Sequence, residues 1–264
     1  MERRLSSWRV VLNVGVGLVF LFLLMPSLIT AIIAFGDSNQ IMFPPQGYSL
    51  HLFRQFFTEV GWVSSTILSF RIALISALIS LILGVPAAYA LVRGNFPGRR
   101  ILSLFLLSPI MVPHIAIALG LYIYFIRLGV NNGELRLILA HVVAALPFVV
   151  VTTGAGVGHI DPALERAATV MGASPLTVLR RVTLPLLAPS IAASGLFAFL
   201  ISFDEVVISW FVSRAGETTL PVKMFASIQF EVSPILAAIS TMLTVMSVLV
   251  CLVVAVMQRK SPNA

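Results

Sequence analysis

The chain has 264 residues, of which 59% are hydrophobic and 10% are charged, and its mean hydropathy is +1.04. Soluble domains are roughly 45–50% apolar and about 25% charged, so the composition excludes an ordinary soluble domain and predicts an integral membrane protein. The formal net charge of +7 would suit nucleic-acid binding in a soluble chain, but here the basic residues flank apolar runs, where orientation signals lie. We therefore expect membrane lipid, and no nucleic acid, among the partners.

Six apolar runs are long enough to cross a bilayer as helices, which takes about 20 residues. The first run is too long for the core of a secretory signal and lacks a clear small-residue cleavage site, so it is predicted to remain as a spanning helix. We expect an all-α fold with six transmembrane helices in one domain covering residues 1–264. The runs lie near residues 10–35, 72–92, 101–126, 137–157, 186–203 and 235–257.

The basic residues predict the orientation of these spans. If the N-terminus lies inside, 11 of the 17 lysines and arginines fall in internal segments and five in external ones. This bias places both termini in the cytoplasm. Arg71, the remaining basic residue, directly precedes the second apolar run. It needs an explanation, because a charge in the middle of the bilayer would be expensive. It either lies at the outer interface and extends toward the headgroups or lines the path of a solute.

The third run contains His114 directly after Pro113. Prolines in spanning helices free backbone carbonyls, which are tolerated where neighbouring helices or a cavity satisfy them. His114 therefore either faces a cavity or, as is commoner for a histidine in a helical bundle, hydrogen-bonds between helices.

Residues 159–184, between the fourth and fifth spans, combine charge and turn residues without a long apolar run. We expect a helical hairpin in the cytoplasm. Asp161 followed by Pro162 is typical of a helix start, with a side-chain cap and a first-turn proline. Gly172 suits the left-handed residue that ends a helix.

A second short helix is predicted from Ser174, which is again followed by proline, to Leu184, because the residue before Pro185 is disfavoured in helical geometry. From these residues alone, the hairpin is either a helix pair on the membrane surface or a docking element for a cytosolic partner. The apolar face of the second helix would hold Leu176, Leu179 and Val182, with Arg180 and Arg181 near its C-terminus.

The fifth run ends at Asp204 and Glu205, after which apolar residues continue from 206 to 212 and include Trp210. A pair of carboxylates between two apolar stretches should face protein, water or a solute. It is either the interfacial end of a helix or an acidic wall for a cationic solute near the outer mouth of a path.

The sequence carries no recognisable catalytic or nucleotide-binding motif, so the chain is predicted not to be an enzyme. Neither of its two lysines lies in a Gly-x-x-x-x-Gly-Lys-Ser/Thr loop, and it lacks the HExxH and GxSxG patterns. Its four histidines are scattered and Cys251 is the only cysteine, so we expect no metal or cofactor in this chain. If the chain does work, the energy for it would have to come from outside this chain.

Six spans with a cytoplasmic hairpin before the fifth resemble the permease subunits of binding-protein-dependent ABC importers. Those subunits carry a Glu-Ala-Ala motif, followed after three residues by glycine and later by Leu-Pro. The corresponding residues are Ala167, Ala168, Gly172, Leu184 and Pro185, with Arg166 in the position of the glutamate and Glu165 one residue earlier.

The resemblance implies a type I (MetI-like) permease fold in the bacterial inner membrane. It also implies a pair of ATP-hydrolysing subunits that bind ATP and Mg, a second and different permease, and an external solute-binding protein. In that family the hairpin is a coupling helix, which sits in a groove of the ATPase and transmits its closure to the spans. Arg180 and Arg181 either meet acidic residues of the ATPase or hold the hairpin to lipid headgroups. The residues predicted to take part in this coupling are Glu165, Arg166, Ala167, Ala168, Gly172, Ser174, Arg180, Arg181 and Pro185.

Residues 202–212, 219–221 and 232–234 are similar to the spermidine/putrescine branch of this family. Polyamine uptake is therefore the expected function. Import of an opine, an aminophosphonate or ferric iron is the alternative, because related permeases share much of this pattern. A stand-alone secondary transporter is the alternative class, although such proteins tend to have internal repeats. The candidates for the substrate path are Asp204, Glu205, Trp210 and Arg71.

Overall fold

The computed structural model describes the backbone of residues 2–214, 216–230 and 232–259, and the side chains of residues 12–214, 216–230, 232–249 and 252. The side chain of Cys251 and several basic residues that predict the orientation lie outside this range.

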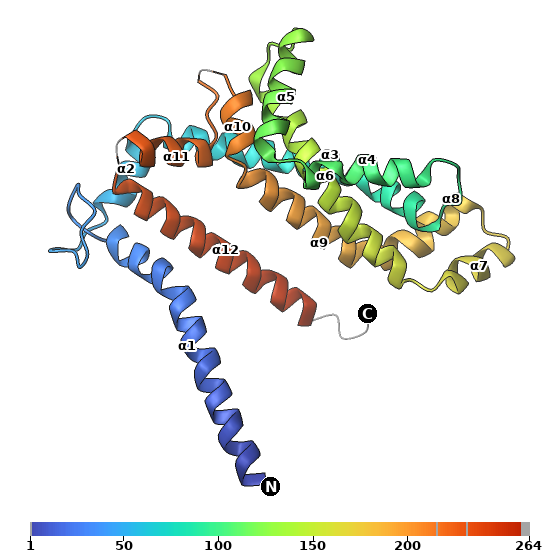
Figure 1. The fold of residues 1–264 in the computed structure, drawn as a ribbon, viewed down its shortest axis with the longest axis horizontal. Helices are drawn as coiled ribbons and strands as arrows, with labels where there is room; N and C mark the ends of the chain where they lie inside the picture. Colours follow the sequence, from blue (N-terminus) through green and yellow to red (C-terminus); the bar gives the residue numbers. More distant parts are fainter. Residues whose placement is uncertain (1, 215, 231, 260–264) are drawn as a thin grey trace. The chain divides into compact units, whose positions relative to one another are not determined.

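The described backbone is helical and has no strand beyond one isolated bridge between Gly36 and Tyr48, which confirms the all-α expectation. The helices are α1 (Glu2–Ala34), α2 (His51–Thr58), α3 (Trp62–Arg93), α4 (Arg99–Met111), α5 (His114–Arg127), α6 (Gly133–His159), α7 (Pro162–Val170), α8 (Pro175–Val178), the π-helical turn η1 (Leu179–Thr183), α9 (Leu184–Phe203), α10 (Val207–Val212), α11 (Leu220–Phe230) and α12 (Ile235–Arg259) (Figure 1).

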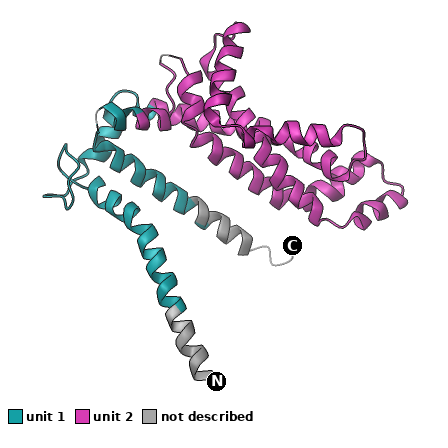
Figure 2. Cartoon of the chain, in the orientation of Figure 1, with its two compact units in different colours: residues 1–63, 226–264 teal, residues 64–225 magenta. Residues whose placement is uncertain are grey.

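Contacts divide the chain into two compact units (Figure 2). Unit 1 comprises residues 1–63 and 226–264, and unit 2 comprises residues 64–225. Unit 1 therefore joins helices from the two ends of the sequence, whereas unit 2 is one continuous segment.

In unit 1, α12 packs against α1 and α2. The buried contact is small and consists of Ala34, Leu52, Ala237 and Ala238. An apolar window of 18 residues in α1 has no buried residue. The exposed apolar surface of such a helix is suited to contact with lipid or with another membrane protein.

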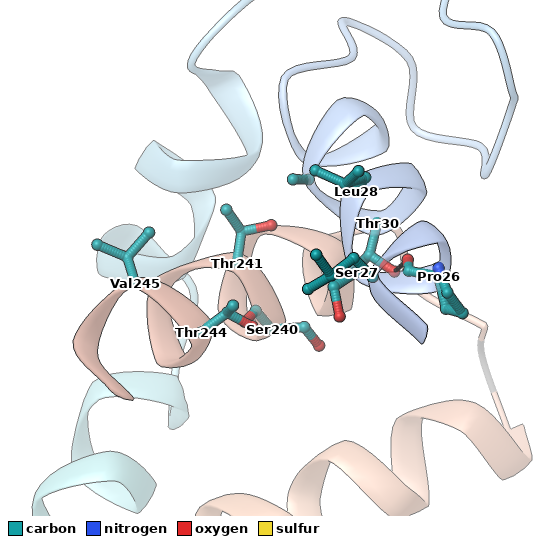
Figure 3. A pocket seen from close by; sticks show the side chains of 10 residues that line it. Pro26, Ser27, Leu28, Thr30, Ser240, Thr241, Thr244 and Val245 are labelled. Atoms are coloured by element: carbon teal, nitrogen blue, oxygen red, sulfur yellow. Dashed lines mark hydrogen bonds between the residues drawn. The ribbon is translucent and has the colours of Figure 1, made fainter. Parts of the chain in front are cut away.

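A hollow of about 330 Å³ opens between α1 and α12 within unit 1 (Figure 3). Hydroxyl groups from both helices line it, but several are bonded to their own helix: Thr30 donates to the carbonyl of Pro26 at 2.8 Å, and Thr241 donates to that of Ala237 at 2.7 Å. Because no charged side chain lines the hollow, it offers no counter-charge to an ionic solute. The lining residues are Leu24, Pro26, Ser27, Leu28, Thr30, Ala31, Ser240, Thr241, Thr244 and Val245.

Unit 2 is built around α6, which is buried on most of its circumference. Small residues allow its neighbours to approach closely. A Cβ added to Gly84 of α3 would lie 2.6 Å from Cγ1 of Val149, and one added to Gly156 would lie 2.2 Å from Oγ of Ser190 on α9. One buried cluster that joins α3, α6 and α9 consists of Ala77, Ala145, Val149 and Ala198.

The membrane character of the chain is confirmed by its long apolar helices. Four described helical segments could cross a membrane, or five if the bent pair α4 and α5 counts as one span. They include α3, α6 and the segment Pro175–Phe203. In α12 the described apolar stretch is Ile235–Leu249, which is shorter than a full span.

The third expected span, residues 101–126, is wrong as a single helix. α4 ends at Met111, α5 begins at His114, and the two helices meet at an angle of 108°. Val112 is extended, with φ −91° and ψ 132°, as is favoured for a residue that precedes a proline. Pro113 therefore interrupts a run whose apolarity is continuous.

The predicted end of the second hairpin helix at Leu184 is also wrong. α8, η1 and α9 form one helical segment from Pro175 to Phe203. In its π-helical turn the Leu184 N–H bonds to the carbonyl of Leu179, five residues back. A proline inside an α-helix clashes with the carbonyl four residues earlier, and the wider turn just before Pro185 makes room for its ring.

This continuous helix changes the surroundings of the residues within it. Arg180 and Arg181 lie in the middle of a long helical segment and not at a helix C-terminus. The predicted apolar face is displaced as well, because Leu176 is exposed whereas Val178 and Thr183 are buried. The buried Val178 and Thr183 are five residues apart, the spacing of a π turn, whereas the prediction assumed the spacing of a regular α-helix.

Candidate functional site

The hairpin of residues 159–184 begins with α7, whose ends are formed as expected. The carboxylate of Asp161 accepts a hydrogen bond from the N–H of Ala163 at 2.8 Å. Gly172 has φ +88°, in the left-handed region that favours glycine. The hydroxyl of Ser174 accepts a hydrogen bond from the N–H of Thr177 at 3.3 Å, at the start of α8. Both predicted helix starts and the glycine turn are confirmed.

Glu165 lies on the inner side of α7 and joins three elements. Its Oε2 lies 3.3 Å from Nε of Arg93, in the last turn of α3, and its side chain is 13% exposed. Its Oε1 accepts a hydrogen bond from the hydroxyl of Thr183, in the π-helical turn, at 2.8 Å. The carboxylate therefore fastens α7 both to α3 and to the helix that continues into α9.

Arg93 extends the same network. Its Nη2 donates a hydrogen bond to the carbonyl of Ile160, just before α7, at 2.5 Å. The hydroxyl of Tyr89, one turn earlier on α3, donates to Oε1 of Glu165 at 3.5 Å. Both ends of the segment from Ile160 to Glu165 are thus held by the end of α3.

The outer side of the hairpin is exposed and carries both apolar and basic residues. Val170 and Met171 are 87% and 88% exposed. A shallow hollow of about 350 Å³ on α7 is lined by Pro162, Glu165, Arg166, Thr169 and Val170. The exposed motif residues are Arg166, Ala167, Gly172, Ser174, Arg180, Arg181 and Pro185, whereas Ala168 is half-buried.

The acidic residues lie in the turn of residues 204–206 between α9 and α10, here called the acidic turn. Asp204 is exposed, whereas the side chain of Glu205 is only 5% exposed. The Oε1 of Glu205 accepts a hydrogen bond from the N–H of Ile208 at 2.8 Å, at the start of α10. The two neighbouring carboxylates therefore have different surroundings, and the sequence pattern did not separate them.

The second oxygen of Glu205 faces His114. Oε2 lies 3.1 Å from Nδ1 of His114, the first residue of α5, and this contact is an ion pair when the imidazole is protonated. The imidazole is 48% exposed. The contact joins the start of α5 to the acidic turn, as the interhelical alternative predicts, while about half of the ring stays exposed.

A buried histidine fixes both sides of the acidic turn. Nδ1 of His141, on α6, lies 2.7 Å from Oγ of Ser202 near the end of α9, and Nε2 lies 2.8 Å from Oγ of Ser209 on α10. All three side chains are buried. Because both ring nitrogens have a hydroxyl partner, the histidine holds the two helices at a fixed separation.

The other two candidates for the substrate path have their own partners. Nη2 of Arg71 lies 2.6 Å from Oε2 of Glu134, at the start of α6. Trp210 is exposed and stacks edge-on against Phe225, with ring centroids 5.6 Å apart. Arg71 is therefore neutralised by a carboxylate outside the acidic turn.

The side chains in these contacts that were not predicted as site residues are Tyr89, Arg93, Glu134, His141, Thr183, Ser202 and Ser209. Arg93 was counted only as an orientation signal, and His141 only as one of four scattered histidines. A histidine within an apolar run is a usable signal, because a buried ring needs hydrogen-bond partners. Among the described side chains no group of three metal-ligating residues is found.

The long apolar helices and the hairpin are those expected of a permease subunit of a binding-protein-dependent ABC importer. Residues 80–261 match the family described as binding-protein-dependent transport system inner membrane component. The chain belongs to this family, as the sequence resemblance predicted, and is a multi-pass membrane transport subunit rather than an enzyme.

Individual relatives place the chain more narrowly within the family. The putrescine transport system permease protein PotI of Escherichia coli strain K12 is 33% identical over 90% of this chain and 86% of its own length. The spermidine/putrescine transport system permease protein PotC of Haemophilus influenzae is 31% identical over 94% of this chain and 96% of its own length. A bacterial ABC transporter involved in the import of alginate has the same fold, with a TM-score of 0.73, 17% identity and coverage of 98% and 97% of the two chains.

Proposed function

We propose that this chain is a permease subunit for polyamines such as spermidine and putrescine. With a second, different permease it would form the membrane path for a solute that an external binding protein delivers. The observation that carries the proposal is the acidic turn, where a buried carboxylate and an exposed one follow each other between apolar helices. Carboxylates in such surroundings are costly unless they serve a path or a partner.

The proposed topology has six spans in one permease domain of residues 1–264, with both termini in the cytoplasm of a bacterial cell. The bent pair α4 and α5 would count as one span, and α12 would be the sixth. The excess of basic residues in the segments then assigned to the cytoplasm supports this orientation. The hairpin would lie on the cytoplasmic side and the acidic turn toward the outer side.

The energy for uptake would come from a pair of ATP-hydrolysing subunits, which bind ATP and Mg, while this chain binds neither. The exposed side of the hairpin would dock into one of them. Val170 and Met171 supply the apolar part of this surface, and the exposed Arg166, Arg180 and Arg181 would meet acidic residues of the partner. Glu165 would act from the inner side, by holding α7 to α3.

Uptake measurements test this function. Cells with and without the chain would be given labelled putrescine and spermidine, with an opine, an aminophosphonate and ferric iron as competitors. Loss of ATP-dependent polyamine uptake on deletion, uncompeted by the other solutes, is the expected result. Loss of a different solute instead would keep the importer class and overturn the polyamine assignment. Uptake that continues without the ATPase subunits would favour a stand-alone secondary transporter.

A further inference from the structure

We propose that His114 is a specificity-determining residue, because it covers one carboxylate oxygen of the acidic turn and so limits how many cationic groups the turn can bind. The proposal rests on the proposed function, in which this turn faces a cationic solute. It concerns the contact between Nδ1 of His114 and Oε2 of Glu205, at 3.1 Å.

The first step concerns the two oxygens of Glu205, which are both engaged. Oε1 accepts the N–H of Ile208 and Oε2 faces His114. A carboxylate that is only 5% exposed needs such partners, because an unpaired buried charge is strongly destabilising. The bond to Ile208 satisfies a buried backbone N–H in the first turn of α10, which has no acceptor within the helix. The oxygen facing His114 therefore changes its partner at lower cost, because His114 is partly exposed and can be hydrated when released.

The second step concerns access. The imidazole of His114 is 48% exposed, whereas the carboxylate that it covers is almost completely buried. His114 is the first residue of α5 and directly follows the break at Pro113. A solute that approaches the acidic turn from the exposed side of the imidazole therefore meets the ring before it meets Glu205.

The third step compares the two carboxylates. Asp204 is exposed, so a cationic group can pair with it directly. A second cationic group can pair with Glu205 only by displacing His114. His141 on α6, a second titratable side chain beside the turn, has both ring nitrogens on Ser202 and Ser209. In this arrangement His114 favours binding at the acidic turn of cations with few charged groups over binding of cations with more charged groups.

Two substitutions at the same position should shift selectivity in opposite directions. His114→Gln removes the possible positive charge and leaves Glu205 available, whereas His114→Lys places a permanent cation beside it. A structural role alone would make both variants worse for every substrate. His51→Gln is the matched control, because His51 lies in unit 1 and hydrogen-bonds the neutral Asn39 at 2.9 Å.

The experiment uses the complete importer in proteoliposomes, with its second permease, ATPase pair and binding protein unchanged. ATP-dependent uptake of labelled putrescine and spermidine gives kcat/KM for a diamine and a triamine. We expect His114→Gln to raise the spermidine-to-putrescine ratio about fivefold, as expected for one exposed ion pair. His114→Lys should lower the ratio, and His51→Gln should leave it unchanged.

A double variant identifies Glu205 as the partner through which His114 acts. When Glu205→Gln is already present, His114→Gln should no longer change the ratio. An undiminished effect in the double variant, or an equal loss of both substrates in both His114 variants, would overturn the proposal while leaving the polyamine function in place. Absence of amine uptake by the unchanged importer would overturn the proposed function itself.

Discussion

Oε2 of Glu165 lies 3.3 Å from Nε of Arg93, although the two residues belong to different helices and are far apart in the sequence. Both side chains are largely buried, and Glu165 also binds the hydroxyl of Thr183. The hairpin is therefore not a separate appendage. Through these contacts, a movement imposed on α7 would act on α3 and on the helix that leads to the acidic turn.

Glu165→Gln should weaken the attachment of the hairpin. Loss of the ion pair should cost about 1–3 kcal/mol, between the values for exposed and fully buried pairs. We expect ATP-driven uptake to fall at least tenfold while basal ATP hydrolysis by the complete importer continues. A comparison of uptake with ATP hydrolysis in proteoliposomes checks this.

An exchange of charges provides the control for that prediction. Arg93→Glu combined with Glu165→Arg should restore part of the uptake that each single variant loses. The exposed Arg166, changed to Gln, should leave the thermal stability of the chain unchanged. If Glu165→Gln couples uptake to hydrolysis normally, the attachment of α7 through Glu165 has no role in coupling.

Substitution of Gly172 should be destabilising because of its left-handed backbone conformation, and not because a side chain would be crowded. Its φ is +88°, and an added Cβ would meet no atom within 4 Å. Gly172→Ala should cost about 1–2 kcal/mol through left-handed strain, and Gly172→Pro should uncouple uptake without preventing membrane insertion. Gly158→Ala, at a helical glycine that also has open space, is the matched control and should have no effect on uptake. Equal behaviour of the two alanine variants would contradict the strain argument.

The two acidic residues should respond differently to substitution. Asp204→Asn should raise KM for polyamines severalfold without changing thermal stability, because the carboxylate is exposed. Glu205→Ala should destabilise the chain by about 1–3 kcal/mol, since it leaves a buried N–H without its acceptor. Thermal unfolding in detergent and uptake kinetics would separate the two effects. Unchanged kinetics for Asp204→Asn would mean that the turn is only an interfacial helix end.

His141→Leu should destabilise unit 2 by about 1–3 kcal/mol, because it leaves the hydroxyls of Ser202 and Ser209 buried and unpaired. Replacement of all three residues by apolar ones, with Ser202→Ala and Ser209→Ala added, should recover much of this loss. Thermal unfolding of the single and triple variants measures both effects. A triple variant no more stable than His141→Leu would show that packing, rather than hydrogen bonding, accounts for the role of His141.

The amino-acid sequence by itself determined the class of the chain and the start of each hairpin helix. Apolar runs fix the membrane character because lipid requires helices with internally bonded backbones. Asp161, Ser174 and Gly172 act on neighbouring backbone groups, so their roles can be read without knowledge of the fold. The motif around Ala167 and Ala168 likewise indicated the permease family.

Only the tertiary structure decided which distant side chains meet. The sequence does not show that Glu165 faces Arg93, that Glu205 is buried against His114 while Asp204 is exposed, or that His141 joins α9 to α10. Such pairs depend on how helices pack and rotate, and a break at Pro113 or a π turn before Pro185 changes that rotation for every residue that follows. Local hydrogen bonding fixes where helices begin, whereas packing between helices fixes which charges become partners.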